Sequence, residues 1–503
     1  MKFYTLAAWL FAVIVPLEAA AQTAREPVVG AILFDGINAF ADDRLFPLYH
    51  DMLGNPFDET RQEQLKKALK ELYQDSGFQT PAITIRQSDA NIWRVFVEEA
   101  HITFLSVEGF GTTGNARLKQ LAQPVLDYRG SLSKLQLDAI EQRLERAADR
   151  PVAVNVKASD SQSGDYHLEI TAQRQIHGEL TYSFEGSERL GQQLVYGRLV
   201  IDNPVASISQ AYISALHTLE SDAYQNIGAG FTLAPALDHR VSLATSFAQA
   251  KPRDANGDEV YNRQWYRLQW RHQAIQEGRR ELSVGSDLSV RDYTRDLDNV
   301  ERIDERLRVA GVFLDNRWRW QDRTLRWYLG GRQGIDGLGA QREGPGATRD
   351  TSLGFGLVKT SATIWQRLPA GLTLRADFGA QYTRDYLPFS ERFSLGGNRY
   401  ARAYEPGEFS GDRGLGTKLE LRKGFDRGGG IAGRFIPYVY YGVARVFDNE
   451  RNDRESGASA GIGLRWLGES ARAYVEVGQP LTTESEYRDD DFRATGRLIV
   501  AFP

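Results

Sequence analysis

The feature that most constrains this chain is an alternation of apolar and polar residues that runs from about residue 174 to the C-terminus. In "GLTLRADFGAQY", which starts at residue 371, every second residue from Leu372 onward is apolar, while Arg375 and Asp377 fall between them. Successive side chains of a β-strand point to opposite faces, so this pattern predicts strands with one apolar and one polar face. Two classes of protein fit: a soluble sandwich that buries the apolar face, and a membrane β-barrel that turns it to lipid.

The lengths of the connections favour the barrel. Roughly sixteen strands of about 10 to 14 residues can be marked, which is the length needed to cross an outer membrane at a tilt. Long connections follow odd strands, near 251–261, 331–351, 385–413 and 481–490, and most turns after even strands are short, as near 235–238, 274–278, 317–320 and 467–470. This asymmetry is typical of outer-membrane barrels, whose short turns face the periplasm. We therefore predict a transmembrane antiparallel β-barrel over residues 174–503, closed by the strand "GRLIVAFP".

The N-terminus predicts export from the cytoplasm. Lys2 is followed by an apolar stretch over 3–16, and Ala19 and Ala21 form an A-x-A cleavage site before Gln22. This is the pattern of a secretory signal peptide, here residues 1–21. The chain has no cysteine, which excludes a disulfide scaffold and thiolate metal sites. We expect the mature protein in the envelope of a Gram-negative bacterium, at the outer membrane.

Residues 22–173 differ in texture from the barrel region, because they mix helices and strands. "DETRQEQLKKALKELYQDSG" places Leu65, Leu69 and Tyr73 on one helical face, and "SKLQLDAIEQRLERA" begins with a capping box of Ser133 and Gln136. A β-α-α-β-β order occurs twice. We predict two small α/β modules, 22–100 and 101–173, on the periplasmic side of the barrel.

Signals for catalysis or metal binding are weak. The seven histidines show no H-E-x-x-H or similar spacing. "GASAG" at 457–461 matches G-x-S-x-G, but a nucleophile elbow needs a helix after it, and here a strand continues. "DANGDE" at 254–259 lacks the rest of a calcium-binding loop. We expect no enzyme activity, no cofactor and no metal, and the mild net charge of -5 gives no reason to expect a nucleic-acid partner.

The long connection over 385–413 is unusual for a surface loop. Gly396 and Gly397 permit tight backbone turns, and Arg402 lies between the small residues Ala401 and Ala403. Small neighbours let an arginine enter a narrow space, where aromatic rings can stack on its guanidinium group. Two interpretations remain open on this ground: a solvated extracellular loop, or a loop folded into the lumen with Arg402 against inward carboxylates.

The stretch over 387–422 resembles the signature segment of the hemolysin secretion/activation proteins, the TpsB transporters of two-partner secretion. Their pattern is E-x-F-x-x-G-G, then V-R-G-F/Y, then S-G-D-x-G. The matching residues here are Glu391, Phe393, Gly396, Gly397, Arg402, Tyr404, Ser410, Gly411, Asp412 and Gly414. The resemblance implies two polypeptide-transport-associated (POTRA) modules and a sixteen-stranded barrel, with the loop inside the lumen.

Three departures from the family pattern bear on the site. Ala401 and Ala403 replace the family's valine and glycine, and alanine for glycine is tolerable only where φ is below zero. On the thirteenth strand Tyr440 takes the aromatic place, and Gly442 replaces the aspartate that pairs with the loop arginine in the family. We expect Glu420, on the inward face of the next strand after the loop, to supply the missing anion. The family often has an N-terminal plug helix, and residues 22–27 leave no room for one, so regulation by that helix is not expected.

The function implied by the resemblance is secretion. The modules would capture an unfolded partner exoprotein in the periplasm, and a monomeric barrel, embedded in outer-membrane lipid, would conduct it to the surface. An assembly factor that inserts other barrels is the first alternative, although such proteins usually carry more modules. A passive porin is the second alternative, and porins lack periplasmic modules.

Overall fold

The structure is a computed structural model that describes residues 28–128, 130–148, 150–159, 164–205, 207–220, 223–253, 258–298, 300–345, 351–426, 433–482 and 492–503. The predicted signal peptide, the segment over 22–27 and most of "DANGDE" lie outside these ranges. No helix within these ranges is both long enough and apolar enough to cross a membrane.

The first α/β module consists of β1 (Ala31–Asp35), α1 (Asp42–Tyr49), the short 3-10 helix η1 (His50–Met52), α2 (Glu59–Asp75), β2 (Ala82–Asp89) and β3 (Ile92–Glu98). β3 pairs in parallel with β1 and antiparallel with β2, so the sheet order is β1-β3-β2. The predicted face of α2 forms the core, because Leu65, Leu69 and Tyr73 are fully buried against β3. α1 was not marked from the sequence, since Pro47 lies inside its eight residues.

The second α/β module repeats this order with β4 (His101–Glu108), α3 (Gly111–Leu126), α4 (Lys134–Ala148), β5 (Val152–Ala158) and β6 (Asp165–Ala172). Its sheet order is β4-β6-β5. The capping box is confirmed: the Ser133 amide donates to Gln136 Oε1 at 2.9 Å, and the Gln136 amide donates to Ser133 Oγ at 3.3 Å. The chain divides into two compact units, and the second module is shared between them. One unit holds the described residues up to 104 with 125–138 and 156–167, and the other holds 105–124, 139–155 and 168–503.

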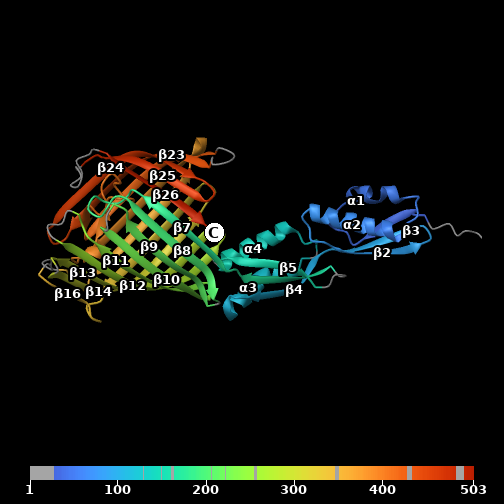
Figure 1. Ribbon diagram of the computed structural model, residues 1–503, viewed down its shortest axis with the longest axis horizontal. Coiled ribbons are helices and arrows are strands. Elements are labelled where there is room, and N and C mark those ends of the chain that lie inside the picture. Colours follow the sequence, from blue (N-terminus) through green and yellow to red (C-terminus); the bar gives the residue numbers. More distant parts are fainter. Residues whose placement is uncertain are drawn as a thin grey trace, which may run out of the picture. The chain divides into compact units, whose positions relative to one another are not determined.

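The remaining strands close into an antiparallel barrel, as Figure 1 shows. Its sixteen main strands are β7 (Gln175–Ser183), β8 (Leu194–Val205), β9 (Ile208–Thr218), β10 (Tyr224–Ala236), β11 (His239–Ala250), β12 (Glu259–Glu277), β13 (Arg280–Leu297), β14 (Val300–Arg319), β15 (Arg323–Gly334), β17 (Gly356–Arg367), β18 (Leu372–Thr383), β21 (Arg413–Lys423), β23 (Arg434–Asp448), β24 (Asp453–Leu467), β25 (Ala471–Pro480) and β26 (Arg493–Phe502). The short strands β16 (Gln341–Glu343) and β22 (Phe425–Asp426) extend the sheet, the 3-10 turn η2 (Pro369–Gly371) joins β17 to β18, and β26 pairs with β7 to close the ring.

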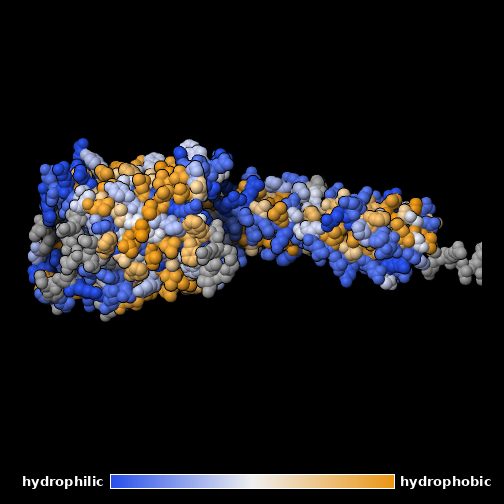
Figure 2. Space-filling view, turned by 90° about the horizontal axis from the view of Figure 1, so that it is seen from above, coloured by the Kyte–Doolittle hydropathy of each residue, from blue (hydrophilic) through white to orange (hydrophobic). Residues whose placement is uncertain are grey.

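The apolar face of the strands is turned outward. Leu419 and Leu421 are 44% and 37% exposed, whereas Lys418 and Glu420, which alternate with them, are 3% and 0% exposed. Figure 2 shows apolar residues spread over the middle of the barrel surface, with polar residues at the rim on the left of the view. This arrangement is that of a membrane barrel, and a soluble sandwich would have the opposite faces buried.

Three strands are much longer than the predicted length of about 10 to 14 residues. β12, β13 and β14 have 19, 18 and 20 residues, well beyond the length needed to cross the bilayer. Their pairing continues to the strand ends, with Glu259 opposite Leu297 and Leu297 opposite Val300, so the ladder extends beyond the length that crosses the membrane.

Candidate functional site

The connection between β18 and β21 folds into a compact structure of its own. It contains the 3-10 turn η3 (Phe389–Glu391) and a small two-stranded sheet of β19 (Phe393–Leu395) and β20 (Phe409–Gly411). Gly396 has a φ of 97°, and a Cβ there would lie 1.9 Å from the Glu405 carbonyl oxygen. The amide of Gly397, whose φ is 65°, donates to the Tyr404 carbonyl at 2.9 Å. The paired glycines therefore permit the tight approach that closes the loop.

Two carboxylates of the motif anchor the ends of the loop. Asp412 is fully buried, and its two oxygens accept the amides of Leu387 and Asn449, each at 2.8 Å. Glu391 pairs with Arg291 of β13 at 2.7 Å and with Arg332 of β15 at 3.4 Å. The first carboxylate ties the loop to the β23–β24 connection, and the second ties it to β13 and β15 of the barrel wall.

Aromatic residues of the loop pack on the inner side of the barrel wall. Tyr404 is fully buried and makes an edge contact with Phe409, with ring centroids 5.4 Å apart. A Cβ added to Gly457 of β24 would lie 2.8 Å from the Tyr404 ring, so the glycine makes room for the tyrosine. Ala444 and Val446 of β23 complete the cluster. Phe393 instead stacks on Tyr400, with ring centroids 5.9 Å apart, and its ring lies over Gly414 of β21.

Arg402 makes an ion pair with Glu476 of β25, and both side chains are largely buried, at 13% and 3% exposed. Its guanidinium group also lies over the Tyr440 ring of β23, 5.3 Å from the centroid. Tyr438, two residues earlier, donates to the same Glu476 carboxylate at 2.7 Å. Glu476 alternates with the outward residues Val475 and Val477, so it belongs to the inward face of its strand. The arginine therefore lies inside the barrel, against its wall.

Glycines on two strands explain how tyrosines of β23 reach β25. A Cβ on Gly461 or Gly463 of β24 would lie 2.5 Å or 2.3 Å from the rings of Tyr440 and Tyr438. A Cβ on Gly478 of β25 would lie 2.0 Å from the Tyr440 hydroxyl. The tyrosines thus lie across the part of β24 where Gly461 and Gly463 leave the inward face without side chains. The sequence carried this signal as "YVY" in β23 and "GIG" in β24, together with an inward glutamate in "AYVEVG", and sequence reasoning missed it.

The expectation that Glu420 pairs with Arg402 is corrected by the structure. Glu420 is fully buried and forms two hydrogen bonds with Arg465 of β24, at 2.5 and 2.8 Å. The Arg465 guanidinium group lies over the Tyr438 ring at 4.0 Å from the centroid, which holds it in place. A fork of two hydrogen bonds from a fixed wall residue satisfies both carboxylate oxygens, so Glu420 acts as a cross-strand tie.

Gly442 has a different structural role from the aspartate that the family pattern places at this position. A Cβ there would lie 3.1 Å from the Ala401 amide nitrogen, so the loop backbone occupies the space where a side chain would stand. Ala401 has a φ of 52°, whereas Ala403 has no positive φ, so alanine for glycine is tolerated at 403. The loop approaches β23 by main chain, and the anion lies on β25 instead.

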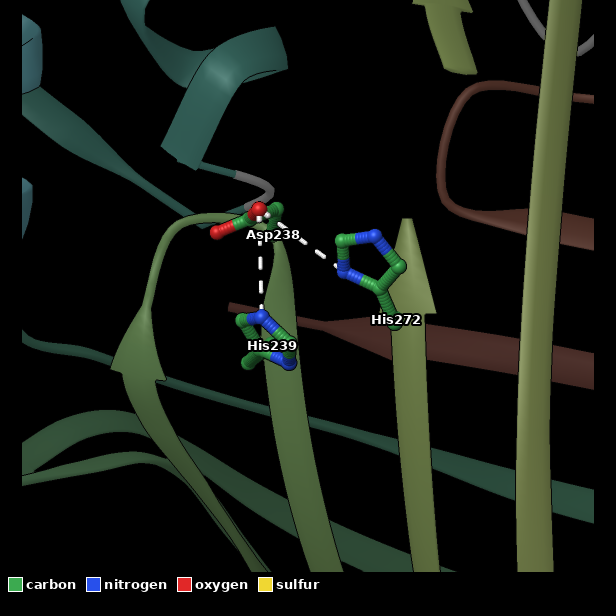
Figure 3. A group of neighbouring side chains, drawn as sticks. All are labelled: Asp238, His239 and His272. Atoms are coloured by element: carbon green, nitrogen blue, oxygen red, sulfur yellow. Dashed lines mark ion pairs between the residues drawn. The ribbon is translucent and has the colours of Figure 1, made fainter. Parts of the chain in front are cut away.

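A group of potential metal ligands lies elsewhere, at the turn between β10 and β11 and on β12 (Figure 3). Asp238 Oδ2 is 3.9 Å from His239 Nε2 and 3.7 Å from His272 Nδ1. Trp270 Nε1 donates to His239 Nδ1 at 3.2 Å, so in the neutral ring Nε2 carries the proton and cannot also bind a metal. The group is therefore better suited to ion pairing. Sequence reasoning missed it because His239 and His272 are neighbours only through strand pairing.

The fold and the loop together define a class of protein. A closed sixteen-stranded barrel with an outward apolar surface, an inward loop and two N-terminal α/β modules has the architecture of an outer-membrane β-barrel protein. The sequence model of the haemolysin secretion/activation protein ShlB/FhaC/HecB family matches residues 164–466. The chain belongs to this family.

Solved structures share the fold. CdiB from Escherichia coli has a TM-score of 0.61 at 18% identity and covers 97% of this chain and 93% of its own. CdiB from Acinetobacter baumannii has a TM-score of 0.54 at 15% identity and covers 94% and 90%. BamA from Haemophilus ducreyi lacking POTRA domains 1–3 has a TM-score of 0.54 at 13% identity and covers 95% and 100%. No curated protein sequence matches the chain.

These findings identify the general activity. The chain is an outer-membrane transporter of two-partner secretion, with a secreted exoprotein as its partner and its N-terminal modules in the periplasm. Its family is one of transporters and not of enzymes. The likeness to BamA shows a shared fold.

Proposed function

We propose that the loop over 385–413 is an internal strut that holds the lumen in its resting form and must shift when the exoprotein passes. The observation that carries this proposal is the buried ion pair of Arg402 and Glu476, which fastens the loop to the barrel wall. Removing one partner of such a buried pair strongly destabilises the folded protein, because the other charge is left buried without compensation. The motif residues that fold the loop around this pair are Glu391, Phe393, Gly396, Gly397, Tyr404, Gly411 and Asp412.

We further propose that the modules, residues 22–100 and 101–173, hold the exoprotein as an extended strand before it enters the barrel. In the first module β2 is an edge strand of the three-stranded sheet, and its outer side has no neighbour in the sheet of the described residues. Main-chain pairing at an edge accepts many sequences, which suits an unfolded cargo. The barrel over 174–503 would then work as a monomer in outer-membrane lipid, and folding of the cargo outside would make transport directional.

The proposal is tested by comparing the proteins released or surface-exposed by the native bacterium with the gene intact, deleted, or carrying Arg402→Gln. We expect deletion to remove one large exoprotein, and Arg402→Gln to reduce its release while the amount of assembled barrel stays unchanged. Normal release in the Arg402→Gln strain would contradict the strut. Depletion of many outer-membrane barrels after deletion would instead favour the assembly-factor alternative, and no change in any exported protein would favour the porin.

A further inference from the structure

Arg493 occupies a position that the transport motif does not explain. It is the first residue of β26, the strand that closes the barrel against β7, and it is 4% exposed. Its Nη1 donates to the carbonyls of Arg402 and Tyr404, at 3.1 and 2.8 Å. Its Nη2 donates to the carbonyls of Glu185 and Gly186, at 3.0 and 3.1 Å. One guanidinium group therefore contacts the loop motif and the β7–β8 connection at the same time.

Arg493 lies beyond the end of the pairing between β26 and β7 that closes the barrel. β26 pairs with β7 from Phe502 opposite Gly178 to Arg497 opposite Ser183, and the ladder ends there. Just beyond it, the Phe184 amide donates to the Gly496 carbonyl at 3.0 Å. Arg493 lies three residues further on, where its side chain joins the two sides of the seam between β26 and β7.

The chemistry of the contact suits arginine. The planar guanidinium group offers pairs of N–H donors in fixed directions, which match two pairs of adjacent carbonyls, whereas a lysine ammonium has no such fork. Hydrogen bonds from a charged donor are stronger than those between neutral groups, and unmaking them inside the protein leaves a buried charge unsatisfied. The four bonds are thus expected to break as a set.

A second contact also joins the loop to the β7–β8 connection. Glu405, one residue beyond the motif tyrosine, accepts the Glu188 amide of the β7–β8 connection at 3.0 Å. The loop is therefore joined to the first connection of the barrel both through Arg493 and directly. In contrast, Arg497 binds Glu185 Oε2 through its Nε at 2.8 Å, and this ion pair crosses the seam without touching the loop motif.

We propose that Arg493 is a positioning residue that couples the loop to the seam, so that the loop cannot leave its place without releasing the end of the β26–β7 closure. This inference rests on the proposed strut function of the loop. In the resting protein the two parts are held together. During passage of the exoprotein, displacement of the loop would loosen the seam, and stabilisation of the seam would hold the loop in the lumen.

The test is hydrogen exchange followed by mass spectrometry on the full chain in lipid nanodiscs, without cargo. Arg493→Gln is compared with Arg497→Gln, a matched substitution on the same strand that removes a seam contact only. For Arg493→Gln we expect exchange to be about tenfold or more faster both in the loop over 393–411 and in the seam strands, since charge-assisted bonds are lost on both sides. For Arg497→Gln we expect faster exchange at the seam and no change in the loop.

The outcomes separate the proposal from its alternatives. Faster exchange in the loop alone, or in the seam alone, for Arg493→Gln would overturn the coupling, and so would an equal loop effect in Arg497→Gln. If the glutamine variant fails to assemble, Arg493→Lys replaces it in the test, because lysine keeps the charge but lacks the fork of donors. In this variant too we expect faster exchange in the loop and in the seam strands together. The exchange experiment contains no cargo, so its result is independent of the secretion assay. The coupling can be refuted while the strut function is supported, and the strut function can be refuted while the coupling is supported.

Discussion

A single carboxylate decides how the loop arginine is held. The family pattern places an aspartate at the position of Gly442, but the loop backbone comes within 3.1 Å of a Cβ there. The anion is supplied by Glu476, two strands further along the barrel, and it is reached through glycines that leave its neighbourhood open. The ion pair is therefore retained while its location in the wall has changed.

Loss of this carboxylate should release the loop. In Glu476→Gln, Arg402 stays buried without its counter-charge, which typically costs about 3–5 kcal/mol. The chain has no cysteine, so Ala403→Cys supplies a single buried thiol in the loop. We expect a maleimide reagent to label this thiol faster in Glu476→Gln than in the parent. Glu420→Gln is the control, since Glu420 binds Arg465, and labelling as fast in that variant as in Glu476→Gln would contradict the assignment.

Two glycines of the loop should respond differently to the same substitution. Gly396→Ala places a Cβ 1.9 Å from a backbone oxygen, whereas Gly407→Ala, with a φ of 76°, meets nothing within 4 Å. The second change costs only the left-handed backbone, about 1–2 kcal/mol, and the first adds a clash that must move the chain. We expect Gly396→Ala to expose the loop to protease and Gly407→Ala to leave it protected. Equal protection in both variants would show that the turn at 396 can relax.

At the scale of elements, alternation is a reliable guide to faces but a poor guide to length. Trp327 and Leu329 alternate with polar or glycine neighbours in the sequence of β15, and both are exposed on the outside of the barrel. Helices were predicted where an apolar stripe was continuous, as in α2 and α4, and α1 was missed because it is short and contains Pro47. The periods are local properties of the chain, whereas the ends of a strand depend on how far its partner continues.

The first module carries a carboxylate whose ionisation should stabilise it. Glu99 accepts the amides of Asn38 and Ala39 and the hydroxyl of Tyr73, at 2.9, 2.8 and 2.8 Å. Burial raises the pKa of Glu99, but the hydrogen bonds to its charged form outweigh burial and the pKa is lowered. The stabilisation is therefore present above the unfolded pKa of about 4.3 and is lost as pH falls through the folded pKa.

This linkage can be measured as protection of the module against hydrogen exchange in the full chain, corrected for the intrinsic rate at each pH. We expect the protection of α2 to fall on acidification below about pH 4.3 in the parent. Glu99→Gln should be less protected at neutral pH and show a smaller decline on acidification. An unchanged decline in Glu99→Gln would assign the acid sensitivity to other carboxylates, and Glu71→Gln, on the exposed side of α2, provides the matched control.

At the scale of the whole molecule, the outer face of the barrel is suited to lipid and its inner face to water. The outer surface meets lipid through residues such as Ile364, while the inner surface is lined by ion pairs such as Asp377 with Lys418, at 3.1 Å. A charge costs little on the inside, where water and counter-charges are available, and much on the outside.

Two substitutions on β17 test this division. Ile364→Lys places a charge on the lipid side, at a cost of up to about 2–4 kcal/mol if the position lies near the midplane. Ser361→Lys adds the same charge on the inward face of the same strand, where the residue is exposed. We expect denaturant titration in lipid vesicles to show a loss of stability for Ile364→Lys and little change for Ser361→Lys. Similar losses in both variants would contradict the assignment of the two faces.

By itself, the sequence determined the class of the barrel, the faces of its strands, the order of the modules and the place of the loop motif. Each of these follows from a local pattern: a period of two, a period near four, or a short run of glycines and charges. The tertiary structure decided which groups meet. Glu476 pairs with Arg402, Glu420 with Arg465, and Arg493 with four carbonyls of two distant segments. Such partners are chosen by strand register, by barrel closure and by the space that glycines leave, and these arise only when residues far apart in the chain are brought together.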